Sequence, residues 1–175
     1  MFAGLAASAS AETAEDARLY QGCCEVQLKQ YPQAVKTLAA LNSNDPLTAA
    51  QTALWLGRAR AGDGDPDDPD ARLEALHNAA DALETAGKAF TLAGDDEFAR
   101  AGRRTVLRER AQVCDQLGEF QQAARLYGEL RDDEEALQRG ATDWTLAGDP
   151  AASEKLAEQF EKSYPQSILT PEVLR

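Results

Sequence analysis

The chain has 175 residues, of which 18 are Lys or Arg and 30 are Asp or Glu, so its formal net charge is −12. A negative charge of this size disfavours nonspecific binding to nucleic acids or anionic membranes, and it favours basic or neutral partners. No uninterrupted apolar run approaches the roughly 20 residues that a membrane-spanning helix needs. Ala, Leu, Gln, Glu and Arg dominate and aromatic residues make up only 6%, a composition that predicts an all-α fold.

Asp-Pro pairs and glycines mark the boundaries of the predicted helices. An aspartate directly before a first-turn proline starts a helix, because its carboxylate accepts from unpaired N–H groups and the proline needs no hydrogen bond. Such pairs occur at Asp45-Pro46, Asp68-Pro69 and Asp149-Pro150. Glycine ends a helix readily, and the expected stops are Gly62, Gly94, Gly118 and Gly148. Eight helices in four antiparallel pairs are therefore expected, over about 13–29, 32–43, 46–61, 69–93, 96–117, 119–131, 133–147 and 150–163.

A pattern of small and large residues returns along the chain with a spacing of about 30 to 35 residues. Its best copy consists of Gly22, Ala34, Leu38, Leu41 and Pro46, and later copies include Ala53 to Gly57, then Gly118, Ala123 and Tyr127, then Gly148, Ala157, Phe160 and Pro165. This pattern resembles the tetratricopeptide repeat. The third copy lacks the closing proline, and an insertion interrupts the second.

The resemblance implies a right-handed α-solenoid of about four antiparallel helix pairs. The repeat domain is expected over residues 15–167, after an N-terminal extension at 1–14 and before a further helix or truncated end at 168–175. The fourth and fifth predicted helices are longer than usual repeat helices and predict a long central hairpin. An alternative is that Gly87 splits the fourth helix, because the residues around it themselves resemble a repeat. The pattern leaves both arrangements open.

An acidic run between the third and fourth helices is a candidate cation site. Asp63, Asp65, Asp67 and Glu74 have the 1, 3, 5 and 12 spacing of an EF-hand calcium loop. Asp68, however, stands where that loop needs glycine, and Pro69 restricts the next position. The favoured interpretation is a solvated insertion over Asp63–Asp70 without a metal, and calcium binding is the alternative.

A cluster of arginines on the fifth helix is a second candidate: Arg100, Arg103, Arg104, Arg108 and Arg110. The first four cover one broad helix face, where their guanidinium groups could clamp a carboxylate or a phosphate. The favoured alternative is a charged outer face that nearby acidic residues, including Asp95, balance.

The third candidate is the concave groove that the resemblance implies, whose wall comes from the first helix of each pair. Mapping the repeat on that wall gives a surface rich in amides and hydroxyls, which suits an extended peptide backbone: Asp16, Leu19, Cys23, Gln27, Gln51, Leu54, Arg58, Thr105, Arg108, Gln112, Gln116, Gln138, Thr142 and Thr145. The residues expected to hold a peptide are Gln51, Arg58, Arg108, Gln112 and Gln138. The alternative is that this face packs on a neighbouring helix of a longer protein.

Residues that carry chemistry are few. The single histidine, His77, is interpreted as partly exposed and structurally idle, and Cys23, Cys24 and Cys114 as small core residues without metal-ligand spacing. The expected function is a non-enzymatic scaffold that binds a protein or peptide, with no catalytic residues, cofactor, metal or nucleic acid. The alternative is a helical accessory or regulatory domain of a larger bacterial envelope enzyme. The sequence leaves the oligomeric state open.

Features at the two ends bear on location. Met1–Ala11 carries no charge and ends in small residues, like the last part of a secretory signal, although it could also be the tail of a previous repeat or the end of a fragment. Tyr164-Pro165-Gln166-Ser167 is similar to repeats of bacterial periplasmic tetratricopeptide proteins. Unpaired cysteines favour a reducing compartment instead. A periplasmic location is expected over a cytoplasmic one, and a helix start after Pro171 indicates an excised fragment.

Overall fold

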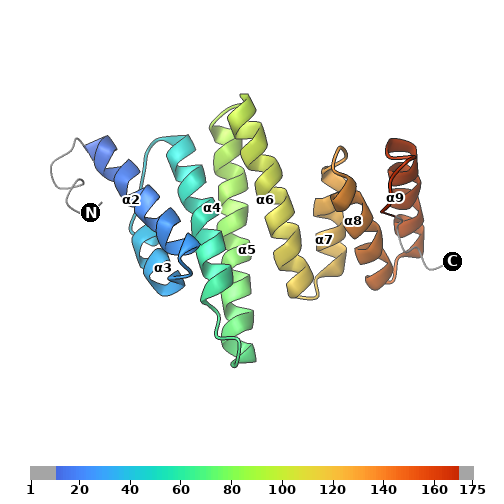
Figure 1. Cartoon of the computed structure of the whole chain (residues 1–175), viewed down its shortest axis with the longest axis horizontal. Coiled ribbons are helices and arrows are strands. Elements are labelled where there is room, and N and C mark those ends of the chain that lie inside the picture. The colour runs from blue at the N-terminus through green and yellow to red at the C-terminus, as the bar shows by residue number, and fades with distance from the viewer. Residues whose placement is uncertain (1–10, 170–175) are drawn as a thin grey trace. The chain divides into compact units, whose positions relative to one another are not determined.

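The computed structural model describes residues 11–169, which form eight α-helices and no strand (Figure 1). The all-α prediction is confirmed, and each helix begins and ends within four residues of its predicted boundaries. The helix α5 is unbroken, so the predicted alternative of a split at Gly87 is wrong. The helices are α2 (Ala11–Gln27), α3 (Tyr31–Ala39), α4 (Pro46–Asp63), α5 (Pro69–Leu92), α6 (Glu97–Gln116), α7 (Phe120–Glu129), α8 (Glu134–Leu146) and α9 (Pro150–Ser163).

The chain divides into two compact units, residues 1–106 and 107–175. In the first unit, α3 packs against α2 and α4, and α4 packs along α5. In the second unit, α8 packs against both α7 and α9. Each unit therefore contains antiparallel neighbours in chain order, while the solenoid of the tetratricopeptide family stays a prediction. Of the expected N-terminal extension at 1–14, residues 11–14 belong to α2, and residues 1–10 lie outside the described part. Residues 170–175 of the further helix or truncated end expected at 168–175 also lie outside it.

Four helices begin at an aspartate whose carboxylate caps the first turn. Asp45, Asp68, Asp133 and Asp149 accept from the backbone N–H groups of Thr48, Ala71, Ala136 and Ala152 at 2.7, 3.1, 3.0 and 3.0 Å. Three of the predicted stops follow helix ends in the left-handed region that glycine enters without strain: Gly94, Gly118 and Gly148, with φ of +116°, +74° and +77°.

The predicted stop at Gly62 is wrong, because α4 continues through Gly62 to Asp63. A Cβ atom at Gly62 would lie 2.5 Å from ring carbons of Tyr31. Carbon atoms normally pack at about 3.5–4.0 Å. The glycine therefore allows α4 to approach the start of α3, and it does not end the helix.

Helices in both units come close where a glycine of one helix faces a leucine of the next. The pairs are Gly22 with Leu38, Gly57 with Leu83 and Gly140 with Leu156, where a Cβ on the glycine would lie 2.4, 2.8 and 2.7 Å from the leucine. No side chain larger than hydrogen fits such a space without movement. The residues expected between helices are buried: Ala34, Leu38, Ala123 and Tyr127.

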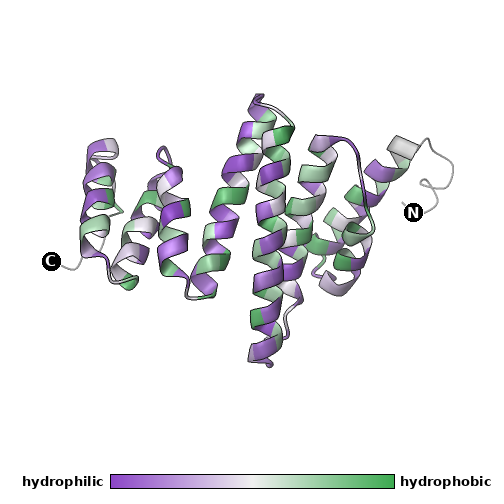
Figure 2. Cartoon of the chain, turned by 180° about the vertical axis from the view of Figure 1, so that it is seen from behind, coloured by the Kyte–Doolittle hydropathy of each residue, from purple (hydrophilic) through white to green (hydrophobic). Residues whose placement is uncertain are grey.

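Apolar and polar residues are interleaved along the helices, as expected for helices with one buried side (Figure 2). The first unit buries a cluster around Leu19 and Leu38, and the second buries clusters around Tyr127 and Phe160. Within residues 11–169, no helix combines the length and apolar character needed to cross a membrane.

Candidate functional site

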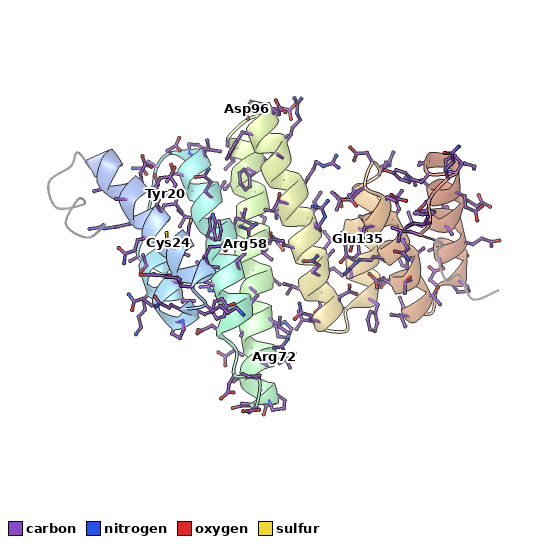
Figure 3. All side chains as sticks on the ribbon, viewed as in Figure 1. Tyr20, Cys24, Arg58, Arg72, Asp96 and Glu135 are labelled. Atoms are coloured by element: carbon purple, nitrogen blue, oxygen red, sulfur yellow. The ribbon has the colours of Figure 1, made fainter. Side chains whose placement is uncertain are left out.

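A groove with a volume of about 760 Å³ lies in the first unit. Its lining consists of residues from four helices and the end of α2: Leu19, Tyr20, Cys23, Cys24, Gln27, Leu28, Gln51, Leu54, Trp55, Arg58, Phe90, Phe98, Ala101, Gly102 and Thr105. Figure 3 labels Tyr20 and Cys24 on α2 and Arg58 on the neighbouring α4. Sites for drug-sized ligands commonly enclose about 300–1,000 Å³, so this groove is large enough to take several side chains of a partner.

The groove is mainly apolar, and much of that apolar surface is exposed. Tyr20, Leu28 and Phe98 keep 64%, 67% and 53% of their surface accessible. The described part of the chain has six large hydrophobic residues that are more than half exposed, and three of them line this one groove. Of the residues predicted for this wall in the first unit, all but Asp16 line the groove: Leu19, Cys23, Gln27, Gln51, Leu54, Arg58 and Thr105. The lining is nevertheless apolar and not rich in amides and hydroxyls as predicted, because further exposed apolar residues contribute to it. Positions that the repeat pattern did not select also face the groove.

Arg58 is the one groove-lining residue with a charged side chain. Its guanidinium carbon lies 4.4 Å from the ring centroid of Trp55, in cation–π geometry. Burial and the adjacent Cys24 raise the pKa of the Cys23 thiol to about 11, against a smaller opposing effect from Arg58. The Cys23 thiol is therefore neutral near pH 7, and Arg58 supplies the positive charge of the groove.

The five residues expected to hold a peptide fall into two sets. Gln51 and Arg58 line the groove of the first unit. Arg108 and Gln112 lie in the second unit at a cavity of only about 10 Å³, and Arg108 forms an ion pair with Asp133. Gln138 is half-buried on α8, where its backbone carbonyl oxygen accepts from the Thr142 hydroxyl at 3.2 Å. The groove thus contains two of the five.

The arginines of α6 make separate structural contacts. Arg103 donates to the backbone carbonyl oxygens of Phe90 and Gly94 at 3.2 and 2.6 Å, so it pairs with carbonyl groups at the C-terminal end of α5. Arg103 also forms an ion pair with Asp95. Arg100 lies 3.8 Å from the same carboxylate. These contacts support the interpretation as a face balanced by local acidic residues, and they do not assemble a single anion clamp.

The acidic run Asp63–Asp70 is engaged in local backbone bonds. Asp65 accepts from the Asp67 N–H at 2.9 Å, and Asp68 accepts from the N–H groups of Asp70 and Ala71 at 3.0 and 3.1 Å. Among residues 11–169, no three His, Cys, Asp or Glu side chains are grouped so as to hold a metal ion. Of the carboxylates that the calcium hypothesis required, Asp65 is thus used to turn the chain, and the adjacent Asp68 starts α5.

Asp68→Ala is expected to lower the free energy of unfolding by about 0.5–2 kcal/mol, because two N–H groups at the start of α5 lose their acceptor. Thermal unfolding measures the change, and Asp67→Ala at a neighbouring exposed position is the matched control. Added calcium should leave both midpoints unchanged. A calcium-dependent rise that disappears in Asp65→Ala would instead support a cation site.

The second unit contains a buried polar cluster that the sequence patterns did not predict. Asp143 of α8 is only 4% exposed, and its Oδ2 atom has no hydrogen-bond partner. Burial, together with a hydrogen bond and charge from Asp115 of α6, raises the pKa of Asp143 to about 8, and Arg139 opposes this shift. The buried Tyr127 hydroxyl lies near Arg139 without a hydrogen bond of ordinary geometry.

A helical signal for this cluster is present in the sequence. Asp143 follows Ala136 by seven residues and Gly140 by three, and both of these residues are buried on α8. Residues with this spacing share a helix face. An aspartate on the apolar stripe of α8 therefore marks a buried carboxyl group.

The remaining chemistry-bearing residues divide by exposure. Cys114 is buried, as expected for a core residue, whereas Cys24 is exposed and lines the groove, so its interpretation as a core residue is wrong. His77 is exposed on α5.

No protein-family model matches the chain, and no curated protein matches it either.

Proposed function

We propose that this chain is a non-enzymatic interaction module, similar to tetratricopeptide repeats, that binds a protein or peptide segment in the groove of the first unit. One observation carries the proposal: Tyr20, Leu28 and Phe98, all more than half exposed, line the same groove. Covering exposed apolar surface contributes about 25 cal/mol per Å² to binding before the opposing terms. A concentration of such surface on a folded domain commonly marks an interaction site.

The groove lining supports binding better than chemical catalysis. None of its residues is His, Asp or Glu, the side chains that most often transfer protons in enzymes. Cys23 is held neutral by its raised pKa, which makes it a weak nucleophile because the thiolate is the reactive form. We also propose a bacterial envelope location for this module, on the residue pattern at Tyr164-Pro165-Gln166-Ser167.

The test is a selection of displayed random peptides on the purified chain. Peptides that the chain enriches are expected to bind at least tenfold more weakly to a Leu28→Ser, Phe98→Ser double variant, a loss of about 1.4 kcal/mol or more. Both positions are exposed, so circular dichroism should show an unchanged helical fold. Fluorescence anisotropy measures the affinities.

The matched control is a Leu73→Ser, Leu92→Ser double variant. These leucines are 46% and 79% exposed on α5, and neither lines the groove. Its affinities are expected to equal those of the unchanged chain. Equal losses in both double variants would indicate general apolar adhesion, and equal binding by all three proteins would remove the groove as the site.

A further inference from the structure

We propose that the segment bound in the groove consists of bulky, uncharged apolar residues joined at one end to Lys or Arg, and that this basic end lies beside Asp16. This inference rests on the proposed function and specifies the chemistry of its partner and the direction in which the partner lies. The distribution of charge around the groove supports both parts.

The groove has two distinct ends, because three of its helices run in the same direction. The helices α2, α4 and α6 each run from the top of Figure 1 towards the bottom, since consecutive helices of this unit are antiparallel neighbours. The start of the groove contains the first lining residue of each of these helices: Leu19, Gln51 and Phe98. The opposite end contains the last lining residue of each: Gln27, Arg58 and Thr105.

The inside of the groove suits uncharged side chains. Asp and Glu make up 30 of the 175 residues, yet none of the residues that line the groove is acidic. A lysine or arginine placed inside it would lose its hydration without gaining a carboxylate partner. A carboxylate would have to compete for Arg58, which lies over the Trp55 ring and has a further interaction. The residues that the partner inserts are therefore expected to be apolar.

Asp16 places a carboxylate on the groove side of α2, just beyond the start of the groove. It precedes Leu19 by three residues and Tyr20 by four, so it lies on the same helix face, one turn away from them. Asp16 is exposed. Arg18 is also exposed, but it lies about 200° around the helix from Asp16, on the opposite face. At this end α2 therefore presents negative charge to a bound segment.

The start of α4 adds negative charge at the same end. Asp45 directly precedes α4 and is exposed, and its carboxylate accepts from the Thr48 N–H at 2.7 Å. A helix start carries a partial positive charge of about half an elementary charge. The charge of Asp45 is therefore offset only in part.

The arginines of α6 do not reverse this charge. Those of its first two turns lie about 120° or more around the helix from Phe98: Arg100, Arg103 and Arg104. Arg103 is bound to carbonyl groups at the end of α5 and to Asp95. Asp96 and Glu97, both exposed, immediately precede Phe98 in the chain, and Figure 3 labels Asp96 at the top of the hairpin of α5 and α6.

The opposite end of the groove has the opposite charge. Lys29 is exposed and directly follows Leu28, which lines the groove. Asp16 and Gln27 are about 16 Å apart along α2, which is more than the distance of about 10 Å over which exposed charges act in 0.1 M salt. A basic residue of the partner is therefore attracted at the Asp16 end and repelled at the Lys29 end. The apolar part of the bound segment extends from Asp16 towards Leu28.

The experiment uses two displayed peptide libraries on the purified chain. Both contain the same random apolar segment, which is followed by a run of lysines in one library and by a run of glutamates in the other. Enrichment is expected from the lysine library. The selected peptides should bind at least tenfold more weakly to the Leu28→Ser, Phe98→Ser variant.

A charge reversal tests where the basic end lies. Asp16→Lys is expected to weaken the selected lysine peptides about fivefold or more at low salt, and less at high salt, because attraction is replaced by repulsion. The matched control is Asp81→Lys, which changes the net charge equally at an exposed position of α5, half a turn around the helix from Phe90. Its affinities should change less than twofold, and circular dichroism should show the same helical fold in both variants.

Two results would overturn this inference and leave the groove as the binding site. One is equal or better enrichment of the glutamate library. The other is a loss of affinity in Asp16→Lys that is no larger than the loss in Asp81→Lys. If neither library yields binders that depend on Leu28 and Phe98, the proposed function fails as well.

Discussion

Asp143→Asn is expected to remove most of the pH dependence of stability that the unchanged chain shows between about pH 5 and pH 8. Asp143 is buried in the second unit beside Asp115 of α6. An ionised carboxylate at this position loses its hydration and meets a second acidic group. Asparagine keeps the shape and a hydrogen-bond donor but has no charge to bury.

The sign of the effect follows from the direction of the pKa shift. The pKa of Asp143 is higher in the folded chain than the value of about 3.9 that aspartate has in unfolded peptides. The folded state therefore binds the additional proton between these values, and the free energy of unfolding falls as the pH rises. This stabilisation is fully present below about pH 4, and it is lost as the pH rises through the folded-state pKa of about 8.

Few other groups titrate in this interval. Burial raises the pKa of Tyr127, which faces the cluster from α7, to about 12, and Arg139 on α8 stays positive. Burial also raises the pKa of Cys23 and of Cys114 to about 11. The sequence holds one histidine, His77, which is exposed. The pH dependence between about 5 and 8 therefore reports mainly on Asp143.

Thermal unfolding at the two ends of this interval measures the effect. A loss of about 2 kcal/mol corresponds to a fall of about 4–8 °C in the midpoint of the unchanged chain. Asp143→Asn should show less than half of that fall, and Asp115→Asn should also reduce it. Glu154→Gln on α9, at an exposed position, is the control and should retain the full fall. An undiminished fall in Asp143→Asn would assign the pH dependence to other groups.

The helices could be predicted because their signals are local. Asp45, Asp68 and Asp149 each stand before a proline and each caps its helix with a carboxylate. Gly62 shows the limit of such reasoning, since the same residue type that ends helices at Gly94 and Gly118 lies inside α4. Whether a glycine ends a helix or lets a neighbour approach depends on contacts with residues distant in the sequence, here with Tyr31.

The groove could be predicted only in part. Most wall residues that the repeat pattern selected in the first unit line it, among them Gln51 and Arg58, because residues at fixed positions of successive first helices share a face. It did not select Tyr20, Leu28 or Phe98, the exposed apolar residues that determine what the groove can bind. A leucine or phenylalanine at a helical position is usually buried. Its exposure depends on whether another helix covers it, which a periodic pattern does not encode.

Gly22→Ala and Leu38→Ala are expected to be strongly non-additive. Leu38 is fully buried, so its truncation alone should lower the free energy of unfolding by about 2–5 kcal/mol. The Cβ of Gly22→Ala would lie 2.4 Å from Leu38 Cδ2, and overpacking of this kind costs about 1–3 kcal/mol. Alanine is better than glycine inside a helix by about 1 kcal/mol, which offsets only part of that cost.

In the Leu38→Ala chain the same Gly22→Ala change should stabilise, because the obstructing side chain is gone and the helix preference remains. Chemical denaturation of the four proteins should give a coupling free energy of about 1–3 kcal/mol. Gly128→Ala on α7 is the control, since its Cβ would lie 3.9 Å from the nearest atom, Leu156 Cδ1, and its effect should add to that of Leu38→Ala. Additive effects of Gly22 and Leu38 would mean that α2 and α3 are not held this close. The first copy of the repeat pattern would then have no packing basis, because the glycine and the leucine that define it would not meet.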